Sequence, residues 1–134
     1  MERARSPARR ALSQAPDRRA RAAVVLRDED RVALIREVRD GHTFFVFPND
    51  SIREGEAPAD AAVREARDEL GVRVIVGPRL LIEELHGQTV HYFSALVVAG
   101  EVGTGAGEPV WFELKELPHY DVRPRALAAI LTGS

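Results

Sequence analysis

Three carboxylates lie close together along one stretch of this sequence. Glu65 is followed by Asp68 and Glu69, at spacings of three and four residues. In a helix these positions fall on adjacent turns, where like charges repel one another. A divalent cation would relieve that repulsion, because hard cations such as Mg²⁺ prefer oxygen ligands from a few carboxylates and from substrate phosphates. The spacing therefore raises a metal site as one interpretation, and a solvated acidic helix face as the other.

The segment that carries these carboxylates has the pattern of an amphipathic helix from about residue 58 to residue 70. Pro58 suits the first helical position, and Gly71 suits the residue just past the end. The apolar residues of this segment form one stripe at helical spacing, namely Ala59, Ala62, Val63, Ala66 and Leu70. The carboxylates fall well off this stripe, so we expect them on the polar side of the helix.

Short apolar and β-branched runs surround the helix and predict strands. A glycine-rich stretch at 100–107 predicts a mobile loop. A closing helix is expected at 123–131, with Ala126, Leu127 and Ile130 turned inward. The predicted strands are a hairpin of 21–27 and 32–38, then 44–47, 72–76 (ended by Gly77-Pro78), 80–85, 89–98 and 110–114. Many strands with one central and one terminal helix indicate a layered α/β fold.

Length and composition limit the classes of protein that this chain could be. Its 134 residues suit one domain. A composition of 45% hydrophobic and 30% charged residues argues against a wholly disordered chain. No apolar run reaches the roughly 20 residues that span a bilayer, so we expect no membrane partner. The absence of cysteine excludes disulfides, zinc-thiolate sites and cysteine nucleophiles, and it is compatible with the cytoplasmic location that we expect.

Charge is concentrated at the start of the chain. Residues 1–20 carry six arginines against Glu2 and Asp17, together with Pro, Ser and Ala. We expect a disordered basic tail over 1–20 and a single domain over 21–134. A phosphate-attracting arm, a partner-binding segment and a transit peptide remain alternatives for the tail. The net charge of −2 gives no global reason to expect nucleic-acid binding.

Residues 50–72 resemble the Nudix box, a 23-residue motif with fixed gaps. The resemblance extends over about residues 21–132, including the strands before the box and the Trp111–Pro118 segment after it. The positions that match the box by identity or class are Glu56, Arg64, Glu65, Glu69, Gly71 and Val72. The resemblance to this family implies a Nudix-type α/β/α sandwich with a mixed β-sheet between helices.

The resemblance also implies an activity, namely metal-dependent hydrolysis of a pyrophosphate bond in a nucleoside diphosphate derivative or nucleotide. Mg²⁺ or Mn²⁺ would be the cofactor, and Glu65, Asp68 and Glu69 would be its ligands. Arg64 would pair with a carboxylate, Glu56 being the candidate, and brace the loop before the helix. A further acidic residue would come from outside the box, and Glu108 is the candidate.

Glu101 is the second candidate for that further acidic residue. The partner would be a nucleotide-like small molecule, and a homodimer is left open.

Three departures from the motif bear on activity. Asn49-Asp50 stands where the family usually has Gly-Gly, Asp68 replaces a glutamate, and Ala66 is smaller than the usual aliphatic residue. Asn and Asp tolerate left-handed backbone angles best after glycine, so the loop is expected to keep its shape. The Asp50 carboxylate would crowd or repel substrate phosphates. The alternative function is therefore a catalytically weak Nudix-like domain that binds a nucleotide or a partner.

Overall fold

The structure is a computed structural model, and it describes residues 20–133. Within that range, eight strands form one curled, mixed sheet with the order β5-β6-β1-β2-β3-β8. Strand β4 pairs with β1, and β7 pairs with β2. The strands are β1 (Ala20–Asp28), β2 (Arg31–Arg39), β3 (His42–Val46), β4 (Asn49–Ser51), β5 (Val72–Leu85), β6 (Gln88–Gly100), β7 (Pro109–Glu113) and β8 (Val122–Arg123).

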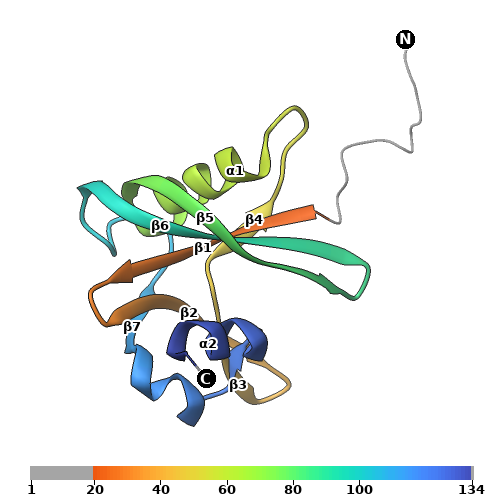
Figure 1. Cartoon of the computed structure of the whole chain (residues 1–134), viewed down its shortest axis with the longest axis vertical. Helices are drawn as coiled ribbons and strands as arrows, with labels where there is room; N and C mark the ends of the chain where they lie inside the picture. Colours follow the sequence, from red (N-terminus) through yellow and green to blue (C-terminus); the bar gives the residue numbers. More distant parts are fainter. Residues whose placement is uncertain (1–19, 134) are drawn as a thin grey trace.

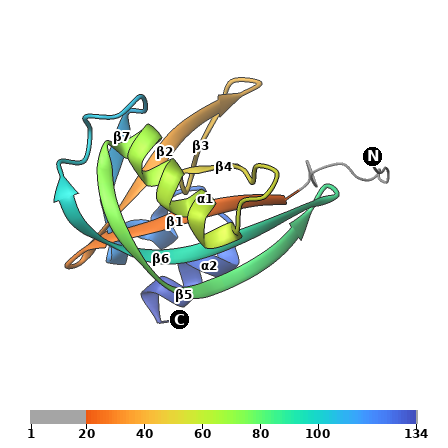
Figure 2. The same ribbon diagram turned by 90° about the horizontal axis from the view of Figure 1, so that it is seen from above.

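The helices lie on opposite sides of this sheet. Helix α1 (Pro58–Glu65) crosses one side, and α2 (Arg125–Thr132) covers the other, as Figures 1 and 2 show. A 3-10 helix at Leu114–His119 precedes β8. The expected α/β/α sandwich with a mixed sheet between helices is therefore confirmed.

Strand β1 is the centre of the fold because it is buried on both faces. Ala22, Val24 and Leu26 pack in the core beneath α1, whereas Ala23 and Val25 pack in the core beneath α2. Alternate side chains of a strand point to opposite faces, so a strand covered on both sides reads as a continuous apolar run. This explains why residues 21–27 show no polar alternation.

The predicted hairpin of β1 and β2 is present only at its turn. The two strands pair at Arg27–Val32 and Asp28–Arg31, and beyond that point they separate. From there β1 pairs with β6 in parallel, while β2 pairs with β3 and β7. The sheet therefore has two halves, which are joined through the short β1–β2 pairing.

Two predicted elements differ from the structure in detail. Strand β5 runs through Gly77-Pro78, where the pairing with β6 is irregular between Val76 and Leu81, so this dipeptide makes a bulge and not an end. In α2, Leu127 is buried as expected, but Ala126 and Ile130 are exposed and Ala128 is buried instead. The side of α2 that faces inward is set by its packing on the sheet, which the short apolar sequence does not specify.

The glycine-rich stretch at 100–107 is held and does not form the mobile loop that we expected. The backbone N–H groups of Gly103, Ala106 and Gly107 donate to the carbonyls of Leu70, Asp68 and Glu69, at 2.9–3.0 Å. The last carbonyls of a helix have no hydrogen-bond donors within the helix, and the N–H groups of this loop supply those donors. The end of the carboxylate-bearing helix is thereby fixed to the segment that precedes β7.

The predicted basic tail lies outside the described residues, except for Ala20, which begins β1. Its disorder and the domain boundary at residue 21 stay predictions. No helix in the described range is both long and apolar enough to cross a membrane.

Candidate functional site

The helix that carries the carboxylates changes type partway along. Helix α1 ends at Glu65 and continues as a π-helical turn, Ala66–Leu70, that stops at Gly71 with φ 83°. The predicted range of 58–70 is confirmed, but the last turn is wider than an α-helical one. Single π-helical turns occur often at functional sites. Because the wider turn changes the angular spacing, Glu65, Asp68 and Glu69 do not form the regular face that an α-helix would give.

Arg64 holds the loop before α1 to the helix. Its side chain is only 6% exposed, and its Nε and Nη2 donate to the two carboxylate oxygens of Glu56, at 2.9 and 3.0 Å. Nη2 also donates to the Ser51 carbonyl at 2.9 Å, and Nη1 donates to Asp50 at 3.2 Å. This hydrogen bonding lowers the pKa of Glu56 to about 2. The expected pairing of Arg64 with Glu56 is present.

Strand β4 carries the Asn49-Asp50 pair and points its side chains in two directions. Asn49 accepts a hydrogen bond from Arg21 Nε at 2.7 Å, whereas Asp50 pairs with Arg64. Neither residue has a positive φ, so their tolerance of left-handed angles is not used. In the loop that leads to α1, the residue with a positive φ is Gly55. The two residues that replace the usual glycines therefore lie in extended backbone, as part of the short strand β4 that pairs with β1.

Glu65 is a buried carboxylate without a hydrogen-bond or ion-pair partner among residues 20–133. It is 6% exposed, although we expected it on the polar side of the helix. Burial, followed by the nearby charges of Glu69 and Asp50, raises its pKa to about 7. Arg64 and Arg21 offset this only in part. Because no described side chain or backbone group bonds to the Glu65 carboxylate, its oxygen atoms are available to a cation.

The donor chemistry fits a hard divalent cation, and Glu65 with Glu69 would be the first ligands. Oxygen donors suit Mg²⁺ or Mn²⁺, and such ions often complete their coordination with water and substrate phosphates. In the described part of the chain, however, no three acidic or histidine side chains are already arranged to hold a metal. The predicted third ligand, Asp68, is half exposed and pairs with Arg67 at 3.1 Å.

The glycine-rich loop reaches the Glu69 side chain at Gly107. A Cβ atom at Gly107 would overlap the Glu69 carboxylate, so only glycine leaves this carboxylate in its present position. Glu108 is the next residue, and it is exposed. The loop therefore brings the backbone of Glu108 beside Glu69. Glu101 lies at the other end of the loop, in a different pocket.

We expect Gly107→Ala to lower kcat by about tenfold or more, because displacement of a catalytic group by about 1 Å can cost that much. The backbone of Gly107 does not have a left-handed φ, so the effect comes from contact with Glu69 alone. The melting temperature should change little, since the Glu69 side chain can swing aside. Steady-state kinetics and thermal unfolding together check this.

Gly105→Ala is the contrasting variant. A Cβ at Gly105 would meet the backbone of Glu69 and Gly71, which cannot move aside, so this variant should lose stability as well. Full activity in Gly107→Ala would show that the position of the Glu69 carboxylate is immaterial.

An arginine-lined cleft of about 420 Å³ lies on the other side of β4 from α1. Arg21 and Asn49 are among the residues that line it, and the charge of Arg21 also acts on Glu65. Three further arginines come from β2, β8 and α2, namely Arg39, Arg123 and Arg125. Arg21 therefore connects the cleft with the helix carboxylates electrostatically.

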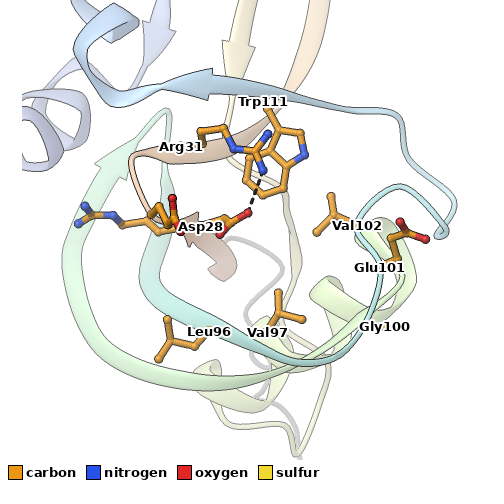
Figure 3. A pocket seen from close by; sticks show the side chains of 10 residues that line it. Asp28, Arg31, Leu96, Val97, Gly100, Glu101, Val102 and Trp111 are labelled. Carbon is orange, nitrogen blue, oxygen red and sulfur yellow. Dashed lines mark hydrogen bonds and ion pairs between the residues drawn. The ribbon is translucent and has the colours of Figure 1, made fainter.

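A second pocket, of about 670 Å³, lies beside the turn that joins β1 and β2 (Figure 3). Trp111 lines it and is covered by the Arg31 guanidinium, 4.3 Å from the ring centroid. Leu96 and Val97 lie opposite, and Glu101 and Val102 close one side. None of the helix carboxylates lines this pocket or the arginine-lined cleft, but Arg21 of the cleft acts on Glu65, whereas no residue of the second pocket does.

Sequence reasoning missed the cleft arginines. They come from four separate elements, so no spacing in the sequence connects them. The aromatic residues considered for base stacking, Phe44, Tyr92 and Phe93, are all buried.

Comparison with known proteins places the chain in a known family. The model of the NUDIX domain family matches residues 16–130. No curated protein sequence matches the chain.

Solved structures share the fold. One is a NUDIX-family hydrolase from Clostridium perfringens, with a TM-score of 0.70 and 16% identity, covering 87% of this chain and 97% of the other. An ADP-ribose pyrophosphatase from Streptococcus suis has a TM-score of 0.67 and 17% identity, over 87% of this chain and 90% of the other. A third is a MutT structure from work on the Aliivibrio salmonicida and Vibrio cholerae proteins. Its TM-score is 0.67 and its sequence identity is 20%, over 85% of this chain and 96% of the other. At these identities the similarity shows the fold alone.

Proposed function

This chain belongs to the Nudix family, and on that premise we propose that it hydrolyses the pyrophosphate bond of a nucleoside diphosphate derivative or nucleotide. The observation that carries the proposal is the buried Glu65, which has no hydrogen-bond or ion-pair partner within residues 20–133 and which feels the charges of Glu69 and of Arg21 in the arginine-lined cleft. We further propose Mg²⁺ or Mn²⁺ as the cofactor, held by Glu65 and Glu69 with Asp68 as the third candidate ligand. A cation bound there supplies positive charge that offsets charge developing on the phosphoryl oxygens.

The protein's own residues would bind and orient the substrate. Arg21, fixed by Asn49, lines the cleft and its charge acts on Glu65, so it would contact a phosphate oxygen of the substrate. Arg64 would act as a positioning residue, since it is fully engaged with Glu56, Asp50 and Ser51. Glu108 would hold a proton or complete the cation's ligands, from its place beside Gly107. Fixed charges of this kind contribute most to phosphoryl transfer.

A phosphate-release screen tests the proposal. It would cover nucleoside diphosphate derivatives and nucleoside triphosphates, with Mg²⁺, with Mn²⁺ and with EDTA. We expect turnover of at least one compound, which EDTA abolishes. Binding of a nucleotide without turnover under any of these conditions would support the alternative, a catalytically weak nucleotide-binding or partner-binding domain.

We expect Asp50→Gly to raise activity on nucleoside diphosphate compounds by about tenfold. The Asp50 side chain is 51% exposed, so its charge faces the region through which phosphates approach. Two like charges about 4 Å apart cost about 1 to 4 kcal/mol depending on screening. Values of kcat/KM for the variant and the parent measure the effect.

Asn49→Gly is the contrasting variant, because it removes no charge and loses the side-chain hydrogen bond that holds Arg21, so it should not raise activity. The variant Asp50→Gly should also be slightly less stable, since its contact with Arg64 is lost. A less active Asp50→Gly protein would instead make Asp50 a working part of the site, such as an additional cation ligand.

A cytoplasmic location and a homodimer stay predictions. Size-exclusion chromatography with light scattering would determine whether the protein is a homodimer.

A further inference from the structure

The cleft beyond β4 has more positive charge than its own carboxylates neutralise. Arg39 and Arg125 have no carboxylate partner among residues 20–133, and Arg21 bonds to the neutral Asn49 and Ser51 side chains. Arg123 alone is paired, with Asp121, through two contacts of 3.0 Å. A surplus of guanidinium groups in a concave site favours an anionic ligand.

One carboxylate lines the cleft, and it is already engaged. Glu83 accepts a hydrogen bond from the Tyr92 hydroxyl, and this contact adds to the burial that raises the pKa of Tyr92. A single carboxylate in this position cannot neutralise Arg21, Arg39 and Arg125 together.

The aromatic residues of the cleft present no free ring to a base. Phe44, Phe47 and Tyr92 line it but are at most 7% exposed. The guanidinium groups of Arg123 and Arg39 lie over the Phe44 ring, at 4.0 and 5.4 Å from its centroid. Recognition in this cleft therefore depends on charge and not on stacking.

The position of the cleft relates its ligand to the reaction. Arg21 lines the cleft and its charge also acts on Glu65, and the other lining arginines lie on β2, β8 and α2. Given the proposed function, on which this inference rests, the pyrophosphate would lie near Glu65 and the rest of the substrate would extend along the cleft.

We infer that the substrate carries an additional phosphate group, separate from the scissile pyrophosphate, and that Arg39 and Arg125 bind it. The substrate class is thus a nucleoside diphosphate derivative with a phosphorylated sugar or other phosphorylated moiety. Arg21 would remain with the pyrophosphate. Arg39 and Arg125 decide between a phosphorylated substrate and its unphosphorylated counterpart.

Paired probes that differ by one ribose phosphate test this inference. They are NADPH against NADH, and coenzyme A against dephospho-coenzyme A, each with Mg²⁺. We expect kcat/KM to be about tenfold higher for the phosphorylated member, mainly through KM, since a charge-assisted hydrogen bond contributes roughly that factor. The preference should shrink as salt is raised, because the arginines are exposed.

The double variant Arg39→Gln/Arg125→Gln should remove the preference. Arg73→Gln is the matched control, since Arg73 is exposed on β5 and lines neither pocket, and it should keep the preference. Equal kcat/KM within both pairs, or a preference that the double variant retains, overturns the inference.

A binding measurement separates this inference from the proposed hydrolysis. Calorimetric titration with adenosine 2′,5′-bisphosphate and with 5′-AMP needs no turnover, and we expect the bisphosphate to bind about tenfold more tightly. If no probe is hydrolysed but this difference is found, the proposed hydrolysis is wrong and the phosphate site stands. Equal affinities, with inorganic phosphate alone binding the cleft, would show that the site takes a free anion and not a substrate phosphate.

Discussion

Glu65→Gln and Glu69→Gln should each lower kcat by about 100-fold or more. Each substitution removes one negative charge from the place where a cation would be held, while it keeps the shape of the side chain. Loss of charge stabilisation at the transition state has an effect of this size. Steady-state kinetics with saturating Mg²⁺ measures it, and Glu101→Gln is the control, since Glu101 lines the separate pocket. Unchanged kcat in both variants would mean that the helix carboxylates hold no catalytic cation.

The stability of Glu65→Gln gives a second readout that does not depend on activity. The folded protein keeps a proton on Glu65 up to about pH 7, whereas the ordinary pKa is 4.5. A raised pKa in the folded state stabilises the protein below pH 4.5, and that contribution is lost as pH rises through 7. Glutamine stays neutral, so the variant should have a higher melting temperature than the parent at pH 8 in EDTA. The difference should disappear below pH 4.5, and an unchanged melting temperature at pH 8 would contradict the burial of Glu65.

Arg64→Ala should destabilise the fold by about 3 kcal/mol, because removal of one partner leaves a buried charge without compensation. The Glu56 side chain is 17% exposed, and Arg64 is its ion-pair partner within residues 20–133. Urea unfolding at pH 7 measures the loss. We also expect a fall in kcat, since the loop with Asp50 and Ser51 would no longer be fixed to α1.

Arg67→Ala is the matched control on the same helix. Its side chain is 66% exposed and pairs with Asp68, so the change should be within about 0.5 kcal/mol. The contribution of the Arg64–Glu56 pair is present above pH 4.5 and is lost as pH falls through about 2, where Glu56 becomes protonated. A stable Arg64→Ala protein would mean that other contacts hold this loop.

The sequence by itself determined those features that depend on neighbours along the chain. Proline at position 58, an apolar stripe and glycine at position 71 specify where the helix begins and ends, because capping and burial act within a few turns. The resemblance to the Nudix box predicted the pairing of Arg64 with Glu56, which the structure contains. Six of the eight strands within residues 20–133 were also predicted, although two of the predicted runs are joined at the Gly77-Pro78 bulge as the single strand β5. Strands β4 and β8 were not predicted.

Only the tertiary structure decided the electrostatic state of the site. Glu65 is buried where α1 packs on β1, and no local pattern distinguishes it from the exposed Asp68. Arg21 reaches Asn49 across 28 residues of sequence, and Arg39, Arg123 and Arg125 meet only when β2, β8 and α2 come together. Burial and long-range charge depend on which elements pack side by side, and that arrangement exists only in the folded chain.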